Sequence, residues 1–134
     1  MLTAALVFPS IAALAGEADD LQRAIDVARQ GAKDLANLDE LKAAREDLAL
    51  LDVWLRSAWT LRSEEKYNEV RVVLDRCQAQ ADMIRETIVA SKISLEAAQK
   101  EGELKALRDE IARTKQAINA AMAKKASLEG KGRS

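Results

Sequence analysis

The stretch YNEVRVVLDRCQAQADMIRETIVASKISLEAA, residues 67–98, decides the fold. It contains neither glycine nor proline, so nothing in it interrupts a helix. Its apolar and small residues recur every three or four positions at Tyr67, Val70, Leu74, Cys77, Ala81, Ile84, Ile88, Ser91, Leu95 and Ala98. This spacing places them on one face of a long α-helix, because a strand would alternate every second residue.

Two shorter stripes of the same period precede this one and predict two more helices, over about residues 18–36 and 38–62. The first stripe is Leu21, Ile25, Ala28, Ala32 and Leu35. The second is Leu41, Ala44, Leu48, Leu51, Leu55 and Ala58. All three stripes together predict an all-α protein, either an antiparallel helical hairpin or a three-helix, coiled-coil-like bundle with a long C-terminal helix.

Polar residues between the stripes predict where the helices begin. Asn37, followed three positions later by Glu40, has the pattern of a capping box. Ser63, followed by Glu64 and Glu65, predicts the start of the third helix, which we expect over about residues 64–123. We therefore expect the tight reversal next to Ser63, with the first two helices running one way and the third running back beside them.

The apolar face of the third helix changes after Gly102. The new stripe is Leu104, Leu107, Ile111, Thr114, Ile118 and Ala121. It is out of phase by two residues, a rotation of about 200° at roughly 100° per residue. The helix is therefore expected to bend near Gly102 or to change the partner on which it packs. Residues 124–134, which contain Gly130 and Gly132, are expected to form a frayed basic tail.

Composition narrows the class of function. The chain of 134 residues has no histidine, a single cysteine and a net charge of −1. Histidine is the commonest general base and metal ligand, and nucleic-acid binders usually carry a basic face. We therefore expect no catalytic, cofactor-binding or metal-binding residues, no nucleic-acid partner and no small-molecule substrate. Cys77 is expected to be buried as an apolar residue, with an intermolecular disulfide as the alternative.

The N-terminal run LTAALVFPSIAALA, residues 2–15, carries no charge and has the length of a signal-peptide core. The small residues Ala13 and Ala15 predict cleavage between Ala15 and Gly16, which would make the protein periplasmic or secreted. No lysine or arginine precedes the run. Two alternatives therefore stay open: a membrane anchor that is retained, and a first helix that belongs to the fold.

Four apolar residues beside the second stripe predict a protein contact. Leu50, Trp54 and Leu61 widen the apolar face, and Trp59 adds a second large aromatic group. We expect a homodimer or a tight heterocomplex with Trp54 or Trp59 in the contact. The alternative is that the first helix folds back over the extra face and gives a monomeric three-helix bundle.

Two resemblances add to this interpretation. Ala58-Trp59-Thr60-Leu61, followed by Lys66-Tyr67-Asn68-Glu69-Val70 and Leu74, resembles one helix-turn-helix of a tetratricopeptide repeat. The layout as a whole resembles a small family of bacterial periplasmic helical-hairpin or coiled-coil proteins of unknown function, often found with OmpA-like domains. Taken with the composition and the N-terminal run, the sequence predicts a non-enzymatic periplasmic adaptor or envelope-structure protein that acts through protein–protein contacts. The alternatives are an inner-membrane-anchored coiled-coil protein with an uncleaved N-terminus, and a periplasmic holdase chaperone.

Overall fold

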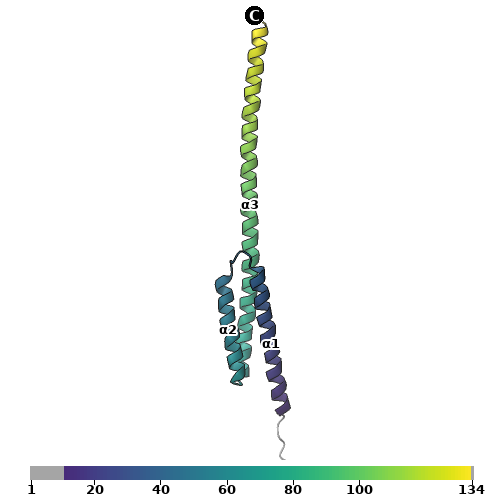
Figure 1. Ribbon diagram of the computed structural model, residues 1–134, viewed down its shortest axis with the longest axis vertical. Coiled ribbons are helices and arrows are strands. Elements are labelled where there is room, and N and C mark those ends of the chain that lie inside the picture. Colours follow the sequence, from purple (N-terminus) through teal and green to yellow (C-terminus); the bar gives the residue numbers. More distant parts are fainter. Residues whose placement is uncertain (1–10, 134) are drawn as a thin grey trace, which may run out of the picture. The chain divides into compact units, whose positions relative to one another are not determined.

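A computed structural model describes residues 11–133, with side chains from Gly16 onward. It contains three α-helices in this part of the chain: α1 (Ile11–Leu38), α2 (Arg45–Ser63) and α3 (Tyr67–Gly132) (Figure 1). The prediction of an all-α bundle with a long C-terminal helix is confirmed. The chain divides into two compact units, Met1–Lys92 and Ile93–Ser134.

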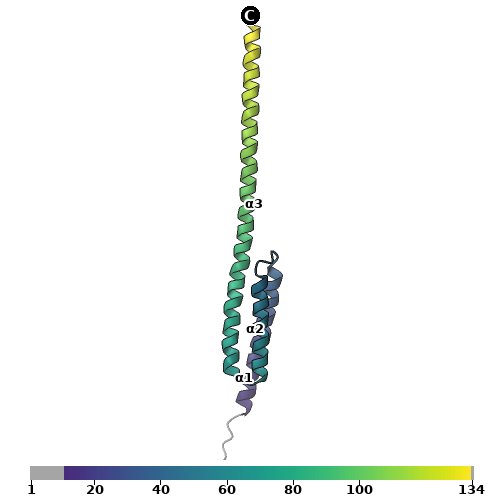
Figure 2. The same cartoon turned by 90° about the vertical axis from the view of Figure 1, so that its left-hand side faces the viewer.

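The first unit is a bundle of α1, α2 and the part of α3 up to Lys92. The loop from α1 to α2 lies at one end of this bundle and the turn from α2 to α3 at the other, so α2 runs opposite to α1 and α3 (Figures 1 and 2). The prediction that the first two helices run in the same direction is therefore wrong. The first helix instead folds back, as in the three-helix alternative.

The core of the bundle is built from the faces that the three stripes predicted. One cluster of buried residues, drawn from all three helices and the residue before α2, comprises Leu35, Ala44, Leu51, Leu55, Cys77, Ile84 and Ile88. The other comprises Leu21, Ile25, Ala58 and Val70. Each fully buried leucine or isoleucine stabilises the fold by about 1.5–3 kcal/mol relative to an exposed one. Because these residues come from separate helices, none of the three can bury its face alone.

The first turn of the bundle depends on Asp39. Its carboxylate is buried and accepts hydrogen bonds from the backbone N–H groups of Ala43 (2.8 Å) and Ala44 (3.0 Å). Lys42 in the same loop has a φ of 57°. The predicted capping box is wrong, because α1 continues through Asn37 to Leu38 and α2 begins only at Arg45. Asp39 has this role because the chain folds back over its carboxylate, which two backbone donors then satisfy.

We expect Asp39→Ala to destabilise the bundle by about 1–3 kcal/mol, because the substitution leaves two backbone N–H groups of the loop without their acceptor. Urea denaturation followed by circular dichroism measures this loss. Asp34→Ala is the matched control, since Asp34 is exposed and bonds only the Gln30 side chain of its own helix. Equal stability of Asp39→Ala and the wild-type protein would show that the carboxylate does not hold the loop.

The second turn lies where the sequence predicts a reversal, but it is formed differently. Ser63 is the last residue of α2, and its hydroxyl donates to the Thr60 carbonyl oxygen at 2.6 Å. The predicted role of Ser63 as an N-cap is therefore wrong. Glu65 has a φ of 60°, and the neighbouring Lys66 ammonium lies 2.7 Å from a carboxylate oxygen of Glu64. The side-chain hydrogen bond and charge of Glu64 raise the pKa of Lys66.

The start of α1 is attached to the bundle from Glu17 onward. The Glu17 carboxylate pairs with Arg71 of α3, and the Ala18 carbonyl oxygen accepts a hydrogen bond from Arg62 of α2 at 3.4 Å. The predicted cleavage point, Ala15 and Gly16, lies inside α1, which begins at Ile11 rather than near residue 18. The rest of the predicted signal segment, residues 2–10, lies outside the described residues.

The second unit contains the remainder of α3, from Ile93 to Gly132. The helix is continuous through Gly102 and through the segment that was predicted to fray, so that prediction is wrong for residues 124–132. A Cβ atom built on Gly102 would meet nothing within 4 Å, so close packing does not require the glycine there. Every described side chain from Ile93 to Arg133 is exposed.

Candidate protein-interaction site

The second unit carries an exposed, mainly apolar face that is interrupted by Thr114 and Lys125. Its large apolar side chains from Leu104 onward are about half exposed, from 48% at Leu104 to 64% at Met122. Most of them occupy the first (a) and fourth (d) positions of a seven-residue repeat, which is the pattern of a coiled-coil contact. We call these a and d positions the C-terminal seam: Leu104, Leu107, Ile111, Thr114, Ile118, Ala121, Lys125 and Leu128.

This seam has the properties of a surface that packs against another helix. A single helix in water gains little from propensity alone, and most helices in proteins are stabilised by burying an apolar face. A shallow depression at the middle of the seam is lined by Leu107, Glu110, Ile111, Thr114 and Lys115. Apolar side chains of a second helix could pack between the apolar side chains of the seam at this depression, and the charged groups of Glu110 and Lys115 would lie at its margin.

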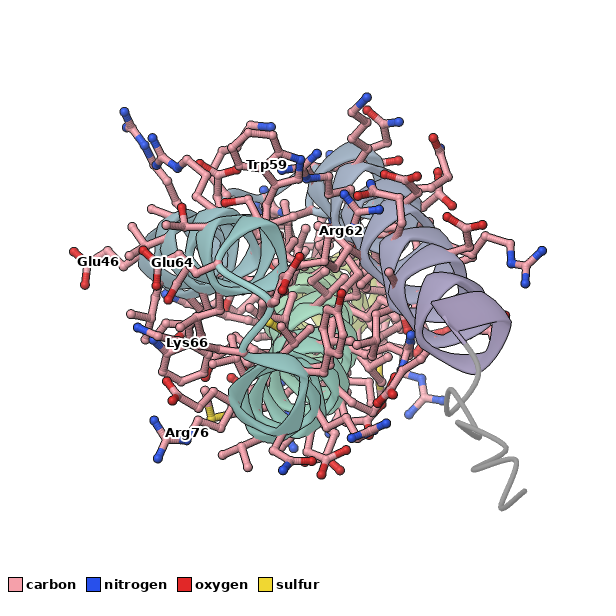
Figure 3. All side chains as sticks on the ribbon, turned by 90° about the horizontal axis from the view of Figure 1, so that it is seen from below. Glu46, Trp59, Arg62, Glu64, Lys66 and Arg76 are labelled. Carbon is pink, nitrogen blue, oxygen red and sulfur yellow. The ribbon has the colours of Figure 1, made fainter. Side chains whose placement is uncertain are left out.

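The four residues predicted to contact a partner do not form one surface. Trp54 and Leu61 are half-buried and pack against the two core clusters. Leu50 and Trp59 are exposed at 41% and 48%. They are nine positions apart in the sequence, so at roughly 100° per residue they point to opposite sides of α2. Figure 3 shows Trp59 with Arg62 towards α1, away from Glu46.

Only part of the seam was predicted from the sequence. The stripe was identified as far as Ala121, but Lys125 and Leu128 were assigned to a frayed tail because of the two nearby glycines. The recurrence of an apolar residue at Leu128, two heptads after Thr114, was the signal that could have extended it. The charged residues that flank the seam were also missed, because no role was assigned to them from the sequence pattern.

Cys77 is buried, with 2% of its surface exposed, which confirms the expectation for this residue. It lies beside an apolar hollow of the bundle that is also lined by Ala28, Gly31 and Ala81. Burial raises the pKa of the Cys77 thiol. The stabilisation linked to this shift is complete below the thiol's unfolded pKa and is lost as the pH rises through the raised one.

We expect the Cys77 thiol to react with a thiol reagent at least about 100-fold more slowly in the native protein than in urea, because reaction requires the bundle to open. Absorbance during labelling with a disulfide reagent measures both rates. Ser57→Cys, made together with Cys77→Ser, is the control, since Ser57 is exposed on α2. Native labelling of Cys77 as fast as labelling of this exposed control would contradict the described burial.

Within residues 11–133, no group of three or more histidine, cysteine or acidic side chains could hold a metal ion. In the same range, no helix combines the length and the hydropathy that crossing a membrane requires. The sequence matches no protein-family model, and comparisons with curated proteins and with solved structures find no match. The resemblances to a periplasmic helical family and to one tetratricopeptide hairpin therefore stay predictions.

Proposed function

We propose that this protein is a non-enzymatic helical adaptor or structural protein of the bacterial cell envelope, which acts through contacts with protein. The observation that carries the proposal is the half-exposed apolar seam from Leu104 to Leu128. The first unit buries its own core, whereas this segment exposes a contact face along about 36 Å of helix at 1.5 Å per residue. Apolar surfaces of this extent usually mark a contact site.

The proposed location is the periplasm, and it rests on the uncharged run at residues 2–15. A chain that begins at Gly16 keeps the attachments of α1 to the bundle. These include the pair between Glu17 and Arg71 and the buried side chains of Leu21 and Ile25. Cleavage at the predicted point is therefore compatible with the bundle.

Mass spectrometry of the protein purified from its native cells tests the location. We expect a mature chain that starts at Gly16 and is released with the periplasmic fraction. Ala15→Gln is expected to block cleavage, because signal cleavage requires a small residue at that position. Ser10→Gln is the control outside the cleavage motif. An intact N-terminus in the membrane fraction would overturn the periplasmic proposal in favour of an anchored protein. An intact N-terminus in the cytoplasm would overturn export altogether.

A further inference from the structure

We propose that the partner at the C-terminal seam is a second copy of this chain, packed parallel and in register over residues 103–129. This inference rests on the proposed function, in which the seam is a contact surface, and it names the occupant. The residues on the seam and the charges beside it all belong to the second unit.

The residues on the seam favour a two-stranded arrangement. Its a positions include Ile111 and Ile118, and its d positions include Leu107 and Leu128. β-Branched residues at a combined with leucine at d favour two parallel strands over three or four. In register, each of these side chains meets the same residue of the second copy, so the apolar layers stay aligned along the whole seam.

The charges that flank the seam complement those of a second copy. In a parallel pair, a residue at g, just before an a position, faces the e residue that lies five places later on the other helix. This rule pairs Glu103 with Arg108, Glu110 with Lys115, and Lys124 with Glu129. All three combinations join opposite charges, and two-fold symmetry forms each of them twice.

The remaining flanking pair fixes the register. In register, Ala117 at g faces Met122 at e, so two apolar residues meet. A shift of one heptad in either direction would instead place a charged residue, Glu110 or Lys124, opposite Met122. An unrelated partner would not require the chain to complement its own charges in this way, which is why a second copy is the occupant we infer.

Lys125 is the one charged residue on the seam itself, at an a position. Its ammonium lies 3.9 Å from a carboxylate oxygen of Glu129, so it is directed towards the margin, while its aliphatic stem can cover the seam. Similarly, the Lys100 ammonium lies 2.8 Å from a carboxylate oxygen of Glu103 in the same chain. Both ion pairs are exposed and contribute little to stability. Their charged groups can therefore pair with a second copy of the chain at a small cost in free energy. A single polar a residue lowers stability but specifies the pairing.

Sedimentation equilibrium of the full chain, at low salt and under reducing conditions, tests the inference with two charge-reversed variants. One carries Glu103→Lys and Glu110→Lys, and the other carries Arg108→Glu and Lys115→Glu. We expect the wild-type chain to be a dimer and each variant to self-associate about a hundredfold more weakly, because four attractive pairs per dimer become repulsive. An equimolar mixture of the two variants is expected to recover wild-type affinity. This recovery is expected because every g–e pair of the mixed dimer again joins opposite charges.

Asp109→Lys is the matched control, because it makes the same charge change one residue from Glu110, on the side away from the seam. It is expected to leave the dimer unchanged, and circular dichroism checks that every variant stays helical. A monomeric wild-type chain, a trimer, or a dimer without recovery in the mixture would each overturn the inference. Such results would leave the proposed function standing if the chain is exported and its seam contacts a different protein.

Discussion

Ile84→Asp is expected to unfold the three-helix bundle. Ile84 has 0% of its surface exposed and belongs to the cluster to which all three helices contribute. An aspartate there would place a carboxylate among the apolar side chains of this cluster and would also remove the packing of the isoleucine. The combined cost exceeds about 4 kcal/mol, a large fraction of the 5–15 kcal/mol that stabilises a typical domain.

Met83→Asp is the control for this prediction, because Met83 precedes Ile84 in α3 and is 45% exposed. We expect it to cost less than about 1 kcal/mol. The signals to follow are the near-ultraviolet circular dichroism of the tryptophans and its thermal transition, since both tryptophans lie on α2. The helical signal alone would also include the second unit. Equal losses in the two variants would mean that the described core is on the wrong face of α3.

The second large effect is expected from Ile111→Asp combined with Ile118→Asp. Both isoleucines are half exposed in one chain and lie on the seam, so the substitutions put charges into the middle of the proposed contact. Loss of two buried isoleucines from each of two copies is expected to weaken association by at least about a thousandfold. Sedimentation equilibrium measures the association, and the near-ultraviolet signal of the bundle is expected to remain unchanged.

Ala112→Asp combined with Asn119→Asp is the control for this pair. It adds the same two charges one residue further along, outside the a and d positions. It is expected to change the association less than about tenfold, in line with the small effects of exposed charges. If both double variants associate as the wild-type chain does, the seam is not the contact.

The three helices could be predicted because their stripes follow a helical period and are long. Leu21, Ile25, Leu51, Ile84 and Ile88 were all placed on core faces from spacing alone, and all are buried. Such prediction succeeds where one local pattern, repeated over several turns, determines which face is covered.

The turns could not be predicted in the same way. The loop between α1 and α2 contains neither glycine nor proline, and Lys42 and Glu65 adopt a positive φ that other residue types usually avoid. Asp39 acts as the acceptor only after α2 folds back, so its role is not visible in the local pattern. The direction of α1 relative to α2 was also mispredicted. Asn37 and Glu40 have the pattern of a new helix start, but α1 continues through Asn37 to Leu38.

The contact residues could be predicted only in part. Trp54 and Leu61 were expected to contact a partner because they widen the apolar stripe of α2. In the bundle, both residues pack against the core clusters instead. The seam in the second unit was recognised as far as Ala121, and Gly130 and Gly132 concealed its continuation. A glycine costs an exposed helix only about 1 kcal/mol, which does not end it.

The most direct test of the central claim, that the seam is where this protein contacts its partner, is site-specific photo-crosslinking in the native cells. A photoreactive residue is placed at Thr114, in the middle of the seam, and separately at Arg113, one residue away from it. We expect an adduct from position 114, with the mass of two copies of the chain, and none from position 113. Adducts from neither position, or equally from both, would contradict it.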